Sequence, residues 1–326
     1  MFNKNPSVSI VFPIFNEEET IKLLYQLVRD VCTKSNVDYE MIFVDDGSTD
    51  NSLNVVKDLK NQDKKVAFVS LSRNFGHQSA LFAGMSYATG DAVITMDADL
   101  QHSPSLIPKM IDLWRNGYEV VYTMKKKYDL PFIMSLVIKL FYWFISKISD
   151  IRLSFGQSDF RLLDRKVLDA ILEIPEYHKF LRGQIEWVGF RQYGLMYDVE
   201  KRHSGKSKIS YRKRLSFALD GIFAFSSYPL HLLMSFSIGV AILSFLYICI
   251  ELTGWMLKAL NICPNLIIPH GWVTLIVSVF FLGSLQLMAI ALVGGYIGRT
   301  YDQTKGRPVF IIKESSVQKK TQAGAR

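Results

Sequence analysis

Short apolar runs alternate with amphipathic stretches over the first 125 residues of the chain. Apolar runs of strand length, rich in β-branched residues, occupy 7–14, 39–44, 66–71, 92–96 and 119–123, with helical spacing between most of them. Repeated strand–helix units predict an α/β fold with a parallel sheet that helices cover on both faces. Ligands of such sheets bind beyond the carboxyl ends of the strands, so the polar residues that follow each strand are the candidates for function.

Polar residues and glycines mark where the helices of these units are expected to begin and end. Asn16, with Glu19 three residues later, resembles a capping box and predicts a helix start. Ser103 before Pro104 predicts another, and Gly117 is expected to close that helix.

The pattern changes after residue 129. Between 135 and 150 a narrow polar stripe faces a broad aromatic surface, which suits either a helix in a membrane interface or a helix that covers the sheet. Residues 212–228 form a second candidate interfacial segment, basic at its start and aromatic later.

Two stretches, 232–250 and 259–298, carry no formal charge. Each has the roughly 20 residues that a helix needs to span a hydrocarbon core of about 30 Å. Buried core helices are the alternative interpretation, but they seldom run this long without a charge. The sequence therefore predicts two transmembrane helices.

Basic residues are placed unevenly around these two stretches. Seven lie between 201 and 214 and four between 299 and 313, whereas the connection between the stretches has only Lys258. The asymmetry predicts a multi-pass protein of the inner or plasma membrane, with its first 228 residues and both termini in the cytoplasm. No secretory signal is recognisable at the start of the chain.

The net charge of +8 fits contact with anionic lipid headgroups. Because the basic residues cluster at membrane borders, a nucleic-acid partner is not expected. The three cysteines have neither metal-ligand spacing nor a disulfide pattern.

The strongest chemical signal is Asp97-Ala98-Asp99 at the end of the fourth predicted strand. Paired carboxylates there can hold Mg²⁺ or Mn²⁺, which would also bind the diphosphate of a nucleotide-sugar and stabilise the leaving group. Gln101 adds a neutral oxygen ligand. Alone, such a pair is often a solvated turn.

Asp45 and Asp46 follow the second predicted strand, where an acidic residue can accept hydrogen bonds from a ribose or a base. No glycine-rich dinucleotide fingerprint follows the first strand, and no phosphate-cradling Gly-x-x-x-x-Gly-Lys run is present. A phosphatase with an aspartyl nucleophile would need its Asp-x-Asp after the first strand.

Four runs of sequence in this order resemble the polyprenyl-phosphate glycosyltransferases, inverting enzymes of glycosyltransferase family two. The runs are Phe-Pro-Ile-Phe-Asn-Glu-Glu (12–18), Val-Asp-Asp-Gly-Ser (44–48), Ser-Arg-Asn-Phe-Gly (72–76) and Asp-Ala-Asp-Leu-Gln (97–101). The run 159–162 and the two C-terminal spans ending in Gly-Tyr-Ile-Gly-Arg (295–299) are most similar to the bactoprenol glucosyltransferase branch. The resemblance extends from residue 8 to about residue 312.

The resemblance implies the GT-A fold and a role for each of several residues. It implies a donor site that includes Pro13, Phe15, Glu17, Asp45, Asp46 and Asp97, and a cation held by Asp97, Asp99 and Gln101. It implies Asp99, Asp159 and Arg161 as catalytic residues, and Arg202 and Lys208 as contacts of the acceptor phosphate. The expected regions are a nucleotide-sugar-binding core (1–128), an acceptor-side region (129–228), the spans (229–298) and a cytoplasmic tail (299–326).

Three positions depart from the family pattern. Ser158 stands where Gly is usual, His77 where Lys is common, and His102 where Asp is common. Solvated loop histidines are the favoured interpretation of His77 and His102, and the departures bear on which sugar is transferred more than on the reaction.

The expected reaction needs no general base, because a lipid phosphate with a second pKa of about 6 is largely a dianion near neutrality. UDP-glucose is the first choice of donor, with UDP-N-acetylglucosamine as the alternative. A processive polysaccharide synthase would carry an arginine that Gln184-Ile185-Glu186-Trp187 lacks, and more spans. A scaffold with an inactive transferase domain would not need the intact Asp97, Asp99 and Gln101. A homo-oligomer is expected from the family, and Gly294 and Gly298 could let two helices approach closely.

Overall fold

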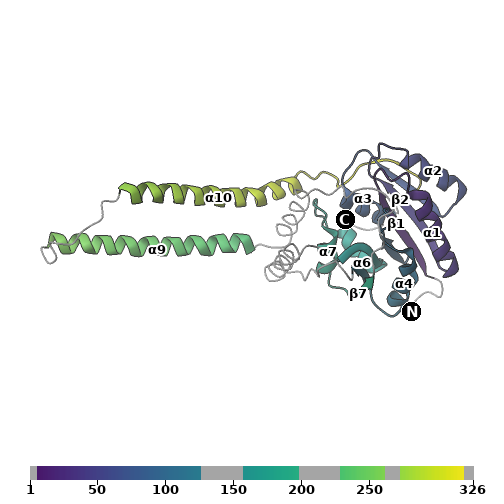
Figure 1. Ribbon diagram of the computed structural model, residues 1–326, viewed down its shortest axis with the longest axis horizontal. Coiled ribbons are helices and arrows are strands. Elements are labelled where there is room, and N and C mark those ends of the chain that lie inside the picture. Colours follow the sequence, from purple (N-terminus) through teal and green to yellow (C-terminus); the bar gives the residue numbers. More distant parts are fainter. Residues whose placement is uncertain (1–5, 126–156, 198–227, 261–271, 319–326) are drawn as a thin grey trace. The chain divides into compact units, whose positions relative to one another are not determined.

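The computed structural model describes residues 6–125, 157–197, 228–260 and 272–318 (Figure 1). The chain divides into two compact units, and the first is built from two separate stretches of sequence, before residue 225 and after residue 305. The second unit comprises the residues between them. The expected interfacial helices at 135–150 and 212–228, together with Arg202 and Lys208, lie outside the described residues, apart from the last residue of the second helix.

Four parallel strands form the centre of the first unit, in the order β4-β1-β2-β3. They are β1 (Ser7–Ile14), β2 (Asp38–Asp45), β3 (Val66–Leu71) and β4 (Ala92–Thr95). Their bounds agree closely with the apolar runs in the sequence. Because these strands are parallel, the residues that follow β1, β2 and β4 meet at one edge of the sheet.

Four further strands complete an eight-stranded sheet in the order β7-β5-β6-β4-β1-β2-β3-β8. They are β5 (Val120–Lys125), β6 (Gln157–Asp164), β7 (Gln192–Tyr197) and β8 (Ile312–Ser315). The five strands that the sequence predicts all run in one direction, since β6 is antiparallel to both β4 and β5. Strands β6 and β8, which the sequence did not predict, run antiparallel to their neighbours and make the complete sheet mixed.

Helices cover both faces of the sheet, as predicted (Figure 1). One face packs on α1 (Ile21–Lys34), α2 (Ser52–Gln62) and α4 (Ile107–Arg115), and the other on α3 (His77–Tyr87), α6 (Arg165–Glu173) and α7 (Leu181–Trp187). Alternate residues of β1 therefore enter different cores: Phe12 stacks on Phe43 at 4.9 Å in the first core, and Val11 lies in the second. Burial on both faces explains why the strands read as continuous apolar runs.

The predicted helix starts are partly corrected. The first helix begins at Ile21 rather than beside Asn16, and Asn16 adopts a left-handed conformation with φ of 56°. Its side-chain oxygen accepts a hydrogen bond from the backbone N–H of Thr49 at 2.8 Å, so it joins two loops instead of capping a helix. After Ser103 the chain first forms a 3₁₀ turn, η1 (Pro104–Leu106), which leads into α4.

The second unit contains two long helices, α9 (Tyr228–Ala259) and α10 (Trp272–Thr304), which lie side by side (Figure 1). By length and composition, 230–247 and 278–304 are candidate membrane spans, and neither window is buried inside the structure. Large apolar side chains such as Phe245, Phe280 and Ile290 are more than 60% exposed. These two helices are therefore not buried core helices. Apolar surface of this extent would be costly to expose to water.

The chain returns to the first unit after α10. Strand β8 pairs with the edge strand β3, and the Lys57 ammonium lies 2.7 Å from the Glu314 carboxylate. The hydroxyl of Ser316 accepts a hydrogen bond from the N–H of Phe68 at 2.8 Å. This strand, which the sequence did not predict, covers an edge of the sheet that would otherwise be open.

Candidate active site

The acidic loop after β4 is anchored by its apolar residues. Ala98 and Leu100 are buried, whereas Asp97, Asp99 and Gln101 are partly exposed. Leu100 has φ of 60°, and the N–H of Gln101 donates to Oδ1 of Asp99 at 3.1 Å. Alternate buried residues thus hold the loop in place, and the two carboxylates and the amide stay partly exposed.

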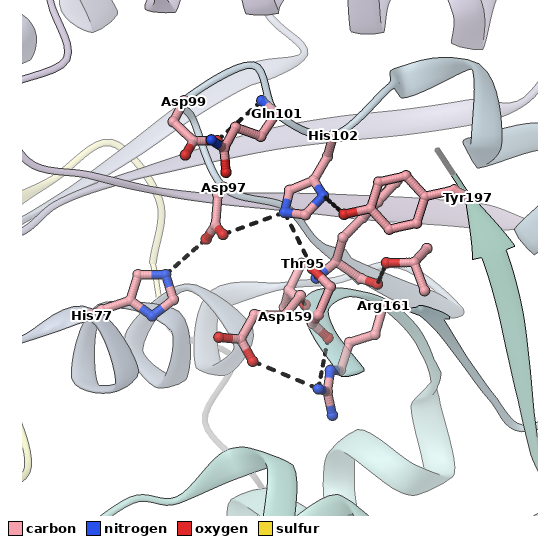
Figure 2. Close-up of polar contacts among 12 residues, drawn as sticks. His77, Thr95, Asp97, Asp99, Gln101, His102, Asp159, Arg161 and Tyr197 are labelled. Atoms are coloured by element: carbon pink, nitrogen blue, oxygen red, sulfur yellow. Dashed lines mark hydrogen bonds and ion pairs between the residues drawn. The ribbon is translucent and has the colours of Figure 1, made fainter. Parts of the chain in front are cut away.

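Two histidine rings contact the Asp97 carboxylate (Figure 2). Nε2 of His77 lies 2.8 Å from Oδ1, and Nε2 of His102 lies 3.4 Å from Oδ2. Desolvation lowers the pKa of His77, but the carboxylate of Asp97 outweighs it and raises the pKa to about 9. Burial would raise the pKa of Asp97, but the contacts with His77 and His102 together outweigh burial and hold that pKa well below its usual range. An ion pair between His77 and Asp97 is therefore present at neutral pH.

The two histidines differ in their surroundings. His77 is 44% exposed, whereas His102 is only 4% exposed and hydrogen-bonds to Tyr197 and Ser158. The interpretation of both as solvated loop residues is wrong for His102. The sequence around His102 gives no signal of burial, because its partner Tyr197 lies 95 residues further along the chain.

Asp159 and Arg161 lie beside the acidic loop because β6 is antiparallel to β4. The start of β6 is thereby brought to the carboxyl end of β4, where Thr95 pairs with Arg161. The hydroxyl of Thr95 donates to the backbone oxygen of Asp159 at 2.6 Å (Figure 2). The topology that the sequence missed is therefore what joins these two residues to Asp97 and Asp99.

Asp159 is held by two arginines. Nε and Nη2 of Arg182, on α7, donate to its two carboxylate oxygens at 2.8 and 2.9 Å, and Arg161 lies 3.6 Å from Oδ1. Burial would raise the pKa of Asp159, but the Arg182 guanidinium outweighs it and lowers the pKa to about 2. Burial lowers the pKa of Arg161 to about 10, so this side chain is still charged near neutrality.

Arg182 is the functional candidate that sequence reasoning missed. It stands two residues before Gln184, in the segment considered only for the absence of a different arginine. The bidentate geometry with a carboxylate is also the geometry with which a guanidinium binds a phosphate. The preceding apolar residue and a short helix gave no sign that Arg182 faces Asp159.

Asp45 and Asp46 have a different environment, since each is only 3% exposed. Asp45 accepts hydrogen bonds from the N–H of Ser48 at 2.9 Å and the hydroxyl of Ser70 at 2.9 Å. Asp46 accepts from the N–H groups of Phe75 and Gly76 at 2.7 and 3.0 Å. Burial raises the pKa of Asp46 in spite of these two donors. Both carboxylates thus organise the loops around the site.

Gly47 explains how closely these loops approach. It has φ of 71°, and a Cβ atom there would lie 2.7 Å from the backbone of Arg73 and Asn74. Only glycine satisfies both conditions, since a side chain would meet the facing backbone as well as the left-handed conformation. The runs 44–48 and 72–76 therefore pack directly against each other.

The expected donor residues of β1 lie at the same edge of the sheet. Pro13 is buried in the strand, Phe15 is 37% exposed, and the N–H of Glu17 donates to the hydroxyl of Ser52 at 2.8 Å. This bond ties the loop after β1 to the start of α2. Phe15 thus presents a partly exposed aromatic surface at this edge, which suits a base or a ribose.

The acidic loop supplies oxygen ligands for a hard divalent cation. Asp97, Asp99 and Gln101 would contribute two carboxylates and an amide oxygen, the ligand type that Mg²⁺ and Mn²⁺ take. Within the described ranges, no three His, Cys, Asp or Glu side chains converge into a complete metal site. These residues suit a divalent cation that takes only some of its ligands from the protein and the others from a diphosphate.

Sequence comparisons extend over nearly the whole chain. The family model described as Glycosyl transferase family 2 matches residues 9–172. An uncharacterized glycosyltransferase of Synechocystis sp. is 38% identical over 308 residues, covering 94% of this chain and 95% of that protein. A prophage bactoprenol glucosyl transferase homolog of Escherichia coli K12 is 37% identical over 309 residues, and the bactoprenol glucosyl transferase of Shigella phage SfII is 37% identical over 311. Each of these two alignments covers 94% of this chain and 98% of the relative.

Proposed function

Because the chain belongs to glycosyltransferase family 2, and its first unit has the GT-A fold, we propose that it transfers one sugar from a nucleotide-sugar to a polyprenyl phosphate. The donor is UDP-glucose and the acceptor undecaprenyl phosphate, with inversion at the sugar carbon. Similarity to bactoprenol glucosyl transferases over 94% of the chain supports both choices. UDP-N-acetylglucosamine is the alternative donor.

One observation carries this proposal: two groups of charged side chains face each other across the carboxyl end of β4. Asp97 and Asp99 lie on one side, and Asp159 with its two arginines lies on the other. A divalent cation on the acidic side, Mg²⁺ or Mn²⁺, would neutralise the charge that builds on the departing diphosphate. Arg161 and Arg182 offer positive charge to the incoming phosphate dianion.

The arrangement works by position and charge. The acceptor phosphate is already a nucleophile, so the residues have to reduce the repulsion between two anionic groups and align them. Asp159 holds Arg182 and Arg161 on one side of the site. Among the described residues, the charged side chains of this site include the carboxylates of Asp97, Asp99 and Asp159 and the guanidinium groups of Arg161 and Arg182.

A donor and acceptor panel tests the function directly. The detergent-solubilised full chain would be incubated with undecaprenyl phosphate and radiolabelled UDP-glucose, UDP-N-acetylglucosamine, UDP-galactose or GDP-mannose. We expect label in the lipid fraction from UDP-glucose, released by mild acid as expected for a sugar on a lipid phosphate. Label from a different donor would overturn the choice of sugar, and no label from any donor would overturn the transfer reaction itself.

Arg202 and Lys208, outside the described residues, belong to the same proposal as contacts of the acceptor phosphate. Each would contribute a charge-assisted hydrogen bond of roughly 1.5–3 kcal/mol, so alanine at either position should raise the acceptor KM about ten-fold or more. A short-chain, water-soluble prenyl phosphate is the right acceptor, because it removes the membrane from the comparison. Donor affinity measured by calorimetry should hardly change. An unchanged acceptor KM in both variants would mean that these side chains touch only lipid headgroups.

The membrane topology is part of the proposal, since nucleotide-sugars are cytoplasmic. In a variant without native cysteines, a cysteine at Asn265 should react with an impermeant reagent from outside the cell. One at Lys313, an exposed residue of β8, should react only after permeabilisation. The reverse pattern would place the catalytic unit on the wrong side of the membrane for its donor.

A further inference from the structure

His102 connects three strands of the sheet through one buried ring. Its Nδ1 lies 2.9 Å from the hydroxyl of Tyr197 on β7, and its Nε2 lies 3.2 Å from the hydroxyl of Ser158 on β6. The same Nε2 lies 3.4 Å from Oδ2 of Asp97, which follows β4 (Figure 2). The ring also packs on Phe160, with centroids 5.3 Å apart.

The partners of the ring determine where its hydrogen sits. A carboxylate can only accept, so the nitrogen that faces Asp97 must be a donor. If Tyr197 donates its hydroxyl hydrogen to Nδ1, then Nε2 carries the ring hydrogen and points it at Asp97 and Ser158. Ser158 can accept there while its oxygen also receives the N–H of Phe160 at 3.2 Å. In this arrangement Nε2–H is shared between Asp97 and Ser158, and Nδ1 accepts from Tyr197.

Tyr197 is well placed to fix the ring. It is 4% exposed, and its strand pairs in register with β5 over six residues, from Gln192 to Tyr197. The hydroxyl is therefore held by the sheet rather than by a loop. Tyr197 is also the last described residue before the segment that contains Arg202 and Lys208.

We propose that His102 is a positioning residue for the divalent cation: Tyr197 fixes the ring, and the ring orients the Asp97 carboxylate. The proposal rests on the proposed function only in taking Asp97 as a cation ligand. A histidine that donates to a liganding carboxylate sets its direction and its basicity, in the way that outer-shell partners of metal ligands generally do. His102 and Ser158, two of the three positions that depart from the family resemblance, contact each other at 3.2 Å.

The test measures Mn²⁺ binding to the full chain in detergent by electron paramagnetic resonance, with Mn²⁺ alone and with Mn²⁺ plus UDP. His102→Ala and Tyr197→Phe should each weaken Mn²⁺ binding by about ten-fold. The double variant should lose no more than His102→Ala alone, because Tyr197 acts through the ring. His102→Gln, which keeps a donor able to reach Asp97, should recover part of the affinity.

Tyr193→Phe is the matched control. Tyr193 lies on the same strand, packs on Tyr118 with ring centroids 4.9 Å apart, and is 39% exposed, so its hydroxyl is remote from this contact. Mn²⁺ affinity should be unchanged in this variant. Thermal unfolding of every variant separates lost orientation from lost folding.

Asp97→Asn separates the inference from the function on which it rests. Weaker Mn²⁺ binding in Asp97→Asn, with unchanged affinity in His102→Ala and Tyr197→Phe, would overturn the inference and leave the proposed cation site standing. Unchanged Mn²⁺ affinity in Asp97→Asn would overturn both. A lower unfolding temperature in Tyr197→Phe without a change in affinity would reduce His102 to a structural residue.

Discussion

Two acidic pairs stand at the carboxyl ends of β2 and β4, on either side of β1 in the same sheet, and have opposite surroundings. Asp45 and Asp46, after β2, are buried and accept hydrogen bonds from the backbone and hydroxyls of adjacent loops. Asp97 and Asp99, after β4, are partly exposed, and the carboxylate of Asp97 contacts two histidine rings. Both pairs stand at the carboxyl end of a strand, and the burial of the carboxylates distinguishes the two pairs.

The difference assigns separate kinds of work to the two pairs. A carboxylate whose oxygens already receive backbone N–H groups is committed to holding a loop, and losing it leaves those donors unpaired. A partly exposed carboxylate can still reach a cation and a diphosphate outside the protein core. Removing a charge from each pair should therefore affect stability in one case and catalysis in the other.

The largest effect is expected at Asp99. Asp99→Asn should lower the rate of sugar transfer on the order of a thousand-fold, because the cation and the diphosphate lose a charged ligand together. EDTA should have the same effect on the unmodified protein. Transfer would be followed with a radiolabelled donor, with Asp112→Asn, at an exposed carboxylate on α4, as the control. Full activity in metal-free buffer would contradict the cation assignment.

A large loss of stability, rather than of chemistry, is expected at Asp46. Asp46→Ala leaves the N–H groups of Phe75 and Gly76 without their acceptor, which should cost about 3 kcal/mol. For a unit of this size the unfolding midpoint should fall by about 6–12 °C. Differential scanning fluorimetry measures it, and Asp99→Ala is the same truncation at a partly exposed carboxylate. Equal midpoints for the two variants would remove the distinction between the pairs.

A smaller and pH-dependent effect is expected at Arg182, whose partner Asp159 belongs to neither class. Arg182→Gln leaves a nearly buried carboxylate without its bidentate partner, at a cost of about 2 kcal/mol near neutrality. Because Arg182 lowers the pKa of Asp159 to about 2, its stabilisation is complete above the ordinary pKa of Asp and is lost as the pH falls toward 2. The gap in unfolding temperature between the two proteins should thus narrow from pH 5 to pH 3. A gap that stays constant over this range would contradict the assigned ion pair.

The fold of the first 125 residues could be predicted because its strands are buried on both faces. Val66–Leu71 and Ser7–Ile14 agree with the predicted bounds residue for residue, since continuous apolar runs of that length have few alternatives. The antiparallel strands could not be predicted in the same way. Strand β6 contains Asp159, Arg161 and Asp164, and its polar residues hide the strand pattern until the neighbours that neutralise them are known.

The candidate site was predicted unevenly for the same reason. Asp97, Asp99 and Gln101 are recognisable as candidate cation ligands because they follow a strand and belong to one of the runs that resemble the family, although such a pair alone is often a solvated turn. Arg182 acquires meaning only from a contact with Asp159, 23 residues earlier in the chain. The contacts of Asp45 and Asp46 depend on donors in β3 and in the loop that follows it, and no sequence pattern around residue 45 predicts these donors.

Strand β8 has a consequence for how the protein is made. The ribosome completes both long helices before it synthesises residues 312–315, so the sheet receives its outermost strand last. Until then β3 presents an unpaired edge, and Lys57 lacks Glu314. A nascent chain that stalls within α10 would therefore carry a sheet whose edge strand β3 is unpaired, and chaperones and proteases recognise such edges. The sheet of the first unit can therefore be complete only after both long helices have been translated.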